Sequence, residues 1–202
     1  MHPEILPPSQ KKLLPLIKNF HPDFYLVGGT ALALQLGHRR SIDYDLFSIK
    51  PFDNLKIRRL IESKHTINRI MIETKTEFTL LIDNIQTTFY TYHYPTKHQV
   101  MFQNIITMPD PLTLGAMKAF TLGMRAKWKD YVDLYFIFKK HSLKQVVAKA
   151  EKIFGSQFDQ KLFREQLVYY KDLNYSQPIE YLPTFAIKDD IIKQTLTKIS
   201  LL

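Results

Sequence analysis

The chain has 202 residues, enough for one domain or two small packed subdomains, and its hydrophobic and charged fractions of 45% and 23% are ordinary for a globular protein. It contains no cysteine, which excludes disulfides, zinc-thiolate sites and cysteine nucleophiles. The net charge of +9 favours an anionic partner such as RNA, a nucleotide or an acidic protein, although a generic basic surface explains it equally well. No stretch reaches the roughly 18 apolar residues of a membrane span, so we expect no membrane partner and a cytoplasmic location.

The first part of the chain alternates helix and strand signals. Residues 9–20 predict a helix, and the short apolar run 24–27 predicts a buried strand that two glycines end. Residues 31–37 are rich in Ala, Leu and Gln and predict a helix that stops at Gly37, while residues 41–47 alternate polar and apolar side chains as a strand does.

The next segments predict one more helix and a run of strands. Residues 52–63 have an approximately helical apolar pattern with Asp53 as the N-cap. Residues 67–73, 77–82 and 85–94 are rich in Ile, Thr, Phe and Tyr, which predicts an antiparallel meander that continues the sheet.

The character of the chain changes after the strands. Asp110 is a plausible N-cap followed by proline, and helical patterns continue from there to the end. We therefore predict an α+β fold with two domains, an α/β domain over residues 1–105 and a helical domain over residues 106–202.

Two glycines and two aspartates form the most informative segment. Gly28, Gly29 and Thr30 follow the first predicted strand, and Asp43 and Asp45 lie on the second. Residues i and i+2 of a strand share a face, so both carboxylates would point into one space, where they suit magnesium. Glycines allow close backbone approach, and a helix N-terminus offers N–H groups to phosphate. The segment predicts a nucleotide and magnesium site, although each half alone is more often a tight turn or a solvated strand face.

Two motifs resemble a known family. The run VGGTALALQLGHRRSIDYDLF, residues 27–47, resembles the first motif of the AbiEii/AbiGii toxin family of nucleotidyltransferases. The later stretch with Lys118, Arg125, Asp130 and Asp133 is similar to that family's helical motif. The resemblance covers nearly the whole chain and implies a DNA polymerase β-like fold, with a mixed sheet, flanking helices and a C-terminal helical bundle.

The resemblance also implies an activity and a set of site residues. It implies Mg²⁺-dependent transfer of a nucleoside monophosphate from an NTP to a hydroxyl acceptor, with RNA and especially the tRNA 3′ end as the expected acceptor. It implies a toxin of a toxin-antitoxin or phage-defence system, hence a cognate antitoxin. By position, Asp43 and Asp45 would bind magnesium, and Asp130 would activate the acceptor hydroxyl or orient a group that does so. The nucleotide would be bound by Gly28, Gly29, Thr30, Arg39, Arg40 and Lys118.

The residues alone also support plainer interpretations. A lysine such as Lys118 on an apolar helix usually extends to solvent, and Asp133 is best explained by an ion pair with Arg125, Lys127 or Lys129. The aromatic residues of the meander, Phe89, Tyr90, Tyr92 and Tyr94, are better explained by core packing than by base stacking.

The sequence departs from the family pattern at one position. Enzymes of this fold commonly have a third carboxylate on a later strand, where this chain has Thr88. This departure leaves two alternatives open. One is a non-catalytic protein that binds RNA or an antitoxin, and the other is a transferase that modifies a small molecule, as antibiotic nucleotidyltransferases do.

Overall fold

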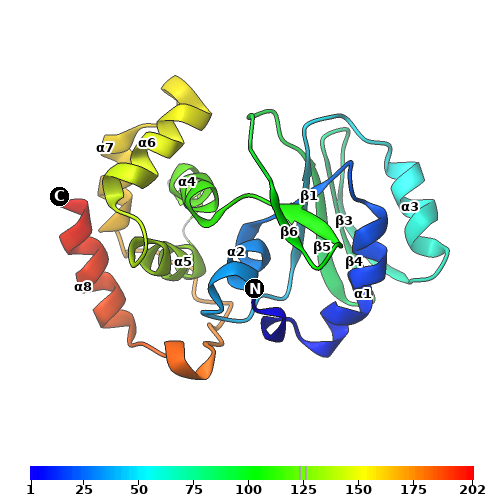
Figure 1. Cartoon of the computed structure of the whole chain (residues 1–202), viewed down its shortest axis with the longest axis horizontal. Helices are drawn as coiled ribbons and strands as arrows, with labels where there is room; N and C mark the ends of the chain where they lie inside the picture. The colour runs from blue at the N-terminus through cyan, green and yellow to red at the C-terminus, as the bar shows by residue number, and fades with distance from the viewer. Residues whose placement is uncertain (123, 126) are drawn as a thin grey trace.

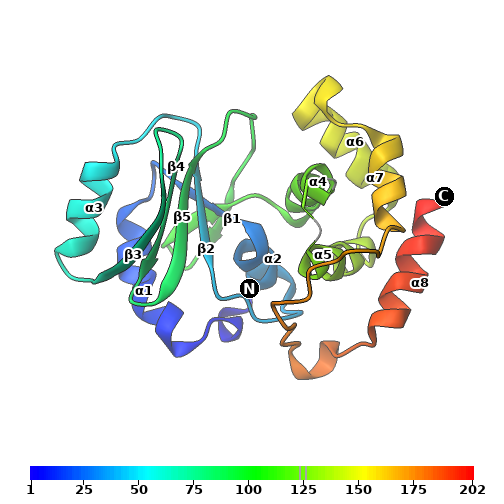
Figure 2. The same cartoon turned by 180° about the vertical axis from the view of Figure 1, so that it is seen from behind.

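A computed structural model describes residues 1–122, 124–125 and 127–202, with a sheet at one end and a group of helices at the other (Figures 1 and 2). The predicted succession of helices and strands is confirmed in the sheet part. Its strands are β1 (Tyr25–Val27), β2 (Tyr44–Ser48), β3 (Ile67–Glu73), β4 (Glu77–Ile82) and β5 (Ile85–Thr91), and its helices are α1 (Pro8–Asn19), α2 (Gly28–Leu36) and α3 (Asn54–Glu62).

The five strands form a mixed sheet in the order β1-β2-β5-β4-β3. The predicted meander is confirmed, because β3, β4 and β5 are successive antiparallel neighbours, and β2 runs antiparallel to β1 but parallel to β5. Turn residues Asp83 and Asn84 both have positive φ, as a tight hairpin turn requires. The register places Asp45 of β2 beside Thr88 of β5, and Thr88 beside Thr79 of β4.

A small hairpin that the sequence analysis did not predict joins the two parts. It consists of β6 (Val100–Phe102) and β7 (Ile106–Met108), and Phe102, Ile106 and Met108 are fully buried. Each strand has three residues, too few for a period-two pattern to be recognised. Residue 105, the expected end of the first domain, lies in the turn of this hairpin, and the division into two domains stays a prediction.

The remaining chain is mostly helical, as predicted. Asp110 accepts a hydrogen bond from the backbone N–H of Thr113 at 2.8 Å and so caps the first helix. Between the last two helices an extended segment returns to the sheet part, where the N–H of Arg40 donates to the carbonyl of Glu180. The helices are α4 (Pro111–Leu122), α5 (Trp128–Phe138), α6 (Leu143–Phe154), α7 (Gln160–Leu167) and α8 (Asp189–Ser200), with 3₁₀ turns at Pro3–Ile5, Gly155–Gln157 and Pro183–Phe185.

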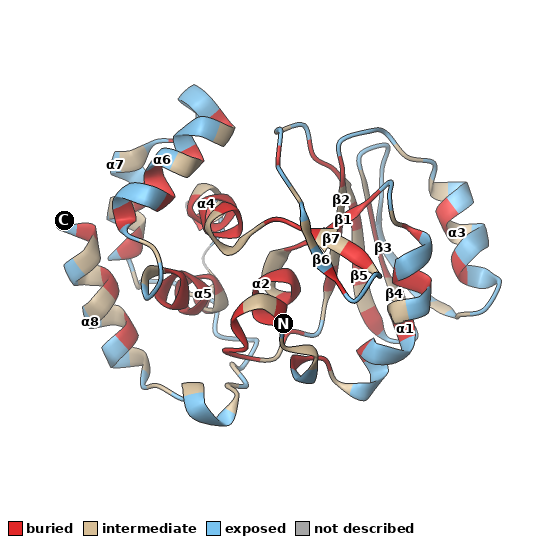
Figure 3. Ribbon diagram, in the orientation of Figure 1, coloured by how far each residue is buried: buried red, intermediate tan, exposed pale blue. Residues whose placement is uncertain are grey.

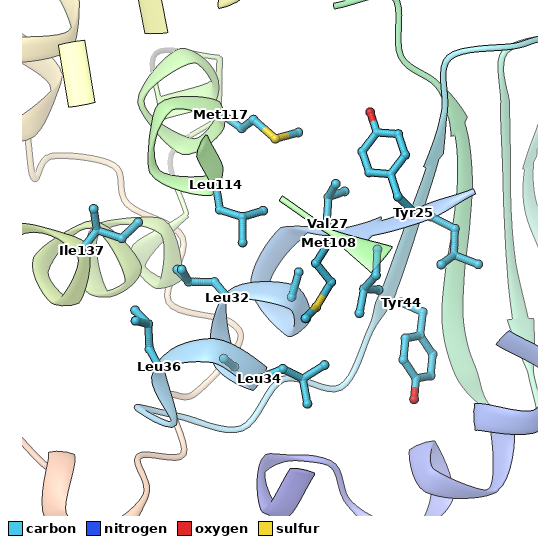
Figure 4. Packing of buried hydrophobic residues seen from close by; sticks show 14 of the residues in the cluster. Tyr25, Val27, Leu32, Leu34, Leu36, Tyr44, Met108, Leu114, Met117 and Ile137 are labelled. Atoms are coloured by element: carbon cyan, nitrogen blue, oxygen red, sulfur yellow. The ribbon is translucent and has the colours of Figure 1, made fainter. Parts of the chain in front are cut away.

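Helix α2 lies between the two parts and is almost entirely buried (Figure 3). Its residues contact β1 and β2 on one side and α4 and α5 on the other. Leu32 of α2, Leu114 of α4 and Ile137 of α5 lie in the space between these helices (Figure 4). A helix that is apolar on every side needs partners all round, which explains why both parts of the chain pack against it. Among the described residues, no helix is long and apolar enough to cross a membrane.

Candidate functional site

A cleft of about 650 Å³ lies between the open face of the sheet and helix α4. The sheet contributes Asp45, Thr88 and Glu77, the start of α2 contributes Gly28, and the helical part contributes Lys118 and Arg125. The cleft is within the size range of ligand sites, and its charged residues come from both parts of the chain. Three predicted site residues, Gly28, Asp45 and Lys118, are thus brought to one cleft.

The carboxylate of Asp45 lies directly against the backbone of Gly28. A Cβ atom on residue 28 would lie 2.1 Å from Oδ2 of Asp45, and the φ angle of Gly28 is +69°. Helix α2 begins at this glycine rather than at Ala31 as predicted, so the glycine pair forms the first turn of the helix. Glycine is required here for two reasons, since it tolerates positive φ and it leaves room for the carboxylate. The free N–H groups at the start of α2 are therefore next to Asp45.

Asp43 lies one residue before β2 and has a cation beside it. The prediction placed it on the strand, but β2 begins at Tyr44. Its Oδ2 atom is 3.6 Å from Nζ of Lys129, and both side chains are 19% exposed. Burial raises the pKa of Asp45, and the nearby charge of Asp43 raises it further. Burial lowers the pKa of Lys129, although Asp43 opposes this effect. The acidic pair is thus a site where additional positive charge would be stabilising.

Thr30 is directed into the protein. It is 1% exposed, and its hydroxyl donates to the carbonyl of Asp43 and lies 3.0 Å from Oγ of Ser41. The hydroxyl therefore fixes the backbone that carries the aspartates, and the phosphate contact expected of Thr30 stays a prediction.

Gly29 makes room for Arg39. A Cβ atom on residue 29 would lie 2.6 Å from Nη2 of Arg39. This arginine is 4% exposed and binds both carboxylate oxygens of Asp133, with Nε 2.7 Å from Oδ1 and Nη2 2.8 Å from Oδ2. His38 Nε2 is also 2.7 Å from Oδ1 of Asp133. The expected partners of Asp133 were wrong, because residues 38 and 39 and Lys118 occupy its oxygens.

Lys118 connects this cluster to the cleft. Its Nζ atom lies 2.8 Å from Asp130 Oδ1 and 2.7 Å from Asp133 Oδ2, and the residue is 5% exposed. The expectation that it extends to solvent was therefore wrong. Arg125 binds Asp130 with Nε 2.9 Å from Oδ2 and Nη2 3.1 Å from Oδ1. We call Arg39, Lys118, Arg125, Asp130 and Asp133 the buried ion network; all are buried except Arg125, whose side chain is 44% exposed.

The carboxylates of the buried ion network are held in the ionised state. Burial alone would raise the pKa of Asp130, but the charges of Lys118 and Arg125 outweigh it and the pKa is lowered. Burial likewise opposes ionisation of Asp133, yet Arg39 and Lys118 hold its pKa well below the usual value. A fully buried carboxylate whose oxygens are occupied by cations is a weak proton acceptor. This property disfavours Asp130 as the general base that activates the acceptor hydroxyl.

Arg40 lies apart from the cleft. Its guanidinium binds Glu180 through Nε and donates from Nη1 to the carbonyl of Glu4 at 3.1 Å. These contacts tie the returning C-terminal segment to the N-terminus. Consecutive arginines therefore have different surroundings, Arg39 in the buried ion network and Arg40 at the surface.

Thr88 is the residue directly beside Asp45 on the neighbouring strand. A carboxylate at residue 88 would therefore lie beside Asp45, and this chain has a hydroxyl there; that this is the family's third-carboxylate position stays a prediction. Thr79 is 3.3 Å from Thr88 between hydroxyl oxygens and donates to Oε1 of Glu77 at 2.9 Å. Glu77 is an acidic cleft residue that the sequence analysis did not single out. Its alternation with Thr79 on β4 was the available signal.

Arg125 and Lys129 are two further cations near the aspartates that were considered only as ion-pair partners of Asp133. The sequence shows their spacing from Lys118 and Asp130. It does not show that Arg125 shares the cleft with Asp45 or that Lys129 lies beside Asp43, because both depend on how α4 and α5 pack. A second, smaller hollow of about 70 Å³ lies beside Lys129 and is lined also by Lys127, Asn174, Ser176 and Gln177.

The acidic pair has the donors that magnesium prefers but not a complete set. Among the residues that the structure describes, no three acidic or histidine side chains form a group able to hold a metal ion. Magnesium commonly binds through one or two carboxylates and completes its coordination with substrate phosphates and water. Asp43 and Asp45 fit that manner of binding, with Gly28 backbone and cleft cations nearby.

Comparison with known proteins connects this geometry to a family. Residues 16–106 match the family described as "Nucleotidyl transferase AbiEii toxin, Type IV TA system". The chain is 34% identical over 156 residues to the uncharacterised protein aq_aa25 of Aquifex aeolicus (strain VF5). The aligned region covers 74% of this chain and 75% of that protein.

Two solved structures share the fold at low sequence identity. MenT4, nucleotidyltransferase toxin Rv2826c from Mycobacterium tuberculosis H37Rv, superposes with a TM-score of 0.66 at 16% identity, over 94% of this chain and 80% of that one. JHP933 from Helicobacter pylori gives a TM-score of 0.62 at 18% identity, over 95% and 88% of the two chains. The predicted α+β fold with a mixed sheet and a following group of helices is confirmed.

Proposed function

Because the chain belongs to the AbiEii family of nucleotidyltransferase toxins, we propose that it transfers a nucleoside monophosphate from an NTP to a hydroxyl group of RNA, with magnesium required. The acceptor end of tRNA is the proposed target, and a cognate antitoxin is the proposed protein partner. One observation supports this most strongly: the Asp45 carboxylate lies against Gly28 at the first turn of α2, in a cleft that also contains Lys118 and Arg125.

Asp43 and Asp45 would hold the magnesium. The raised pKa of Asp45 supports this, because a half-buried carboxylate beside a second carboxylate is stabilised by a bound cation. Magnesium would supply charge neutralisation on the phosphates. The backbone N–H groups at the start of α2 would bind phosphate oxygens, as helix N-termini do, and Gly28 would allow the phosphate to approach.

Lys118 and Arg125 would offset the negative charge that develops on the departing pyrophosphate. Both residues line the cleft, and both are fixed by Asp130. Preorganised cations of this kind stabilise charge without reorganising during the reaction. We propose that Asp130 acts by positioning these two side chains, since its lowered pKa and occupied oxygens disfavour proton abstraction. Arg39 and Asp133 would in turn position Lys118.

The acceptor hydroxyl would approach from the side of Asp43. In the transfer, the acceptor oxygen forms a bond to the α-phosphorus, the bond to the bridging oxygen of pyrophosphate breaks, and the hydroxyl proton is lost to solvent. In-line displacement needs the acceptor and the leaving group on opposite sides of the phosphorus. The hollow beside Lys127 and Lys129 lies on the Asp43 side, and a basic surface favours RNA.

Transfer of label from α-labelled NTPs to RNA tests this proposal. We would incubate the protein with each α-labelled NTP, magnesium and total RNA, and repeat the reaction with RNA whose 3′ hydroxyl is blocked by phosphate. The proposal predicts label in RNA that the 3′ block abolishes. Label that enters protein instead, or an aminoglycoside added in a parallel reaction, would refute RNA as the acceptor. A protein that binds RNA without transferring label would refute the activity.

A further inference from the structure

Three tyrosines at alternating positions line the cleft beyond its charged residues. Tyr90, Tyr92 and Tyr94 lie at i, i+2 and i+4, and all three border the cleft, whereas Phe89 points to the other side of the sheet and is fully buried. The core-packing interpretation is therefore confirmed for Phe89 and incomplete for the tyrosines. Tyr90 and Tyr94 remain partly exposed.

The tyrosines belong to a continuous row of rings. Phe47 is 5.2 Å from Tyr90 and 4.9 Å from Tyr92 between ring centroids, and Tyr92 is 5.2 Å from Tyr94. Tyr94 is 5.5 Å from Phe120 of α4, so the row reaches from the sheet to the helical part. We call Phe47, Tyr90, Tyr92, Tyr94 and Phe120 the aromatic wall. It is more than core packing, because every member also borders the cleft.

The aromatic wall begins next to the charged residues. Phe47 follows Asp45 at i+2 on β2, and Tyr90 follows Thr88 at i+2 on β5, so each pair shares the cleft face of the sheet. Lys118 and Phe120 likewise both border the cleft from α4. One cavity thus combines a carboxylate and cations with flat aromatic surface. A ligand that matches both has an anionic group joined to a planar, weakly polar ring, and a nucleotide has this chemistry.

The wall also has hydrogen-bonding groups that the protein leaves available. The hydroxyls of Tyr90 and Tyr92 make no hydrogen bond to any residue in the described part of the chain. Tyr94 donates its hydroxyl to Oε1 of Gln157, an exposed glutamine that borders the cleft, so the amide nitrogen is the group with which Gln157 can donate to a ligand. Ring nitrogens and carbonyl oxygens of a nucleobase are such acceptors.

We propose that the aromatic wall binds the base of the incoming NTP, with Tyr90 as the principal stacking surface and Gln157 as a contact to the base edge. This inference rests on the proposed function, since it assumes that the triphosphate lies at Asp45, Lys118 and Arg125. The base is favoured over an acceptor nucleotide because the wall and the triphosphate site share one cavity, while the acceptor side lies at Asp43 and Lys129.

Binding measurements with two ligands test the subsite. A non-hydrolysable NTP and inorganic tripolyphosphate, each with magnesium, are titrated into the wild-type protein and the variants Tyr90→Ala and Tyr90→Phe. Stacking on an aromatic ring contributes about 1–3 kcal/mol per base, so we expect Tyr90→Ala to weaken NTP binding by roughly 5- to 150-fold and to leave tripolyphosphate binding unchanged. Tyr90→Phe keeps the ring and should bind the NTP nearly as well as wild type.

One further variant tests the contact to the base edge, and another is a control outside the cleft. Gln157→Ala, at an exposed position, should weaken NTP binding severalfold without changing tripolyphosphate binding. Tyr169→Ala removes a tyrosine that is 46% exposed and lies outside the cleft, and it should change neither affinity.

The outcomes separate the two proposals. Equal wild-type affinity for both ligands, or Tyr90→Ala binding the NTP as wild type does, would overturn the base subsite and leave the proposed activity intact. Loss of tripolyphosphate binding in Tyr90→Ala would also overturn it, because the ring would then act through the structure of the phosphate site. A wild-type protein that binds neither ligand would refute the proposed function and this inference with it.

Discussion

The Oδ2 atom of Asp45 occupies the space into which a side chain at Gly28 would project, 2.1 Å from an ideal Cβ position. The glycine motif and the aspartate motif are therefore one structural unit: residue 28 must lack a side chain so that the carboxylate can lie against the first turn of α2. Any side chain at this position has to displace the carboxylate or the backbone.

Gly28→Ala should strongly reduce activity while leaving a folded protein. The positive φ of Gly28 makes alanine unfavourable by about 1 kcal/mol or more, and the displaced Asp45 should reduce transfer by roughly 100-fold, since small shifts of reacting groups have effects of this size. Gly155→Ala is the matched control, because Gly155 also has positive φ but has open space around its Cβ position. Comparable losses of activity in both variants would show that strain alone, and not contact with Asp45, is responsible.

Asp45→Asn should remove the stabilising effect of magnesium. Thermal unfolding is measured with a non-hydrolysable NTP, with and without magnesium. A ligand at 100 times its dissociation constant stabilises the native state by about 2.7 kcal/mol, a change that this measurement detects. Wild type should show this increase on magnesium addition and Asp45→Asn should not. Without metal, the variant should be at least as stable as wild type, because a half-buried charge near Asp43 has been removed. Asp190→Asn is an exposed control, and an equal magnesium effect in all three proteins would contradict the assignment.

Asp133→Asn should be strongly destabilising, by about 3–5 kcal/mol, because Arg39 would stay buried without its carboxylate and Lys118 would keep only Asp130. Urea unfolding at neutral pH measures the loss, with Asp190→Asn again as the exposed comparison. A change below about 1 kcal/mol would mean that the buried ion network has little part in stability.

The same network predicts a pH dependence. The pKa values of Asp130 and Asp133 are lowered in the folded protein, so their contribution is fully present above the ordinary pKa of 3.8 and is lost as the pH falls through the lowered values. The free energy of unfolding of wild type should therefore decrease below about pH 5, and more steeply than that of Asp133→Asn. Parallel pH curves for the two proteins would rule out this source of acid sensitivity.

Sequence reasoning predicted the helices and strands well and the contacts of individual side chains poorly, while the assignment of the site residues stays a prediction. The strands Ile67–Glu73 and Glu77–Ile82 follow from local composition. Thr88 was singled out through the family resemblance, and its pairing with Asp45 depends on a strand order that the sequence did not predict. The partners of Asp133 did not follow, because Arg39 is 94 residues away in the chain and meets it only when α2 packs against α5. The local charge pattern suggested partners close to Asp133 in the sequence instead.

Thr88→Asp should strengthen magnesium binding. The substitution adds a carboxylate on the strand directly beside Asp45, where oxygen donors already converge. We expect half-maximal activity at a lower magnesium concentration than in wild type. Gln194→Asp serves as the control, because Gln194 is an exposed residue of α8 and does not line the cleft. An unchanged or higher magnesium requirement in Thr88→Asp would show that the missing carboxylate does not limit metal binding.

Transfer from NTP labelled at the α- or the γ-phosphate tests the central claim most directly. With magnesium and RNA, the account predicts that the α label enters RNA and the γ label appears in pyrophosphate, in equal amounts, and that the Asp43→Ala/Asp45→Ala double variant does neither while remaining folded. Transfer of the α label by the double variant at the wild-type rate would contradict the account.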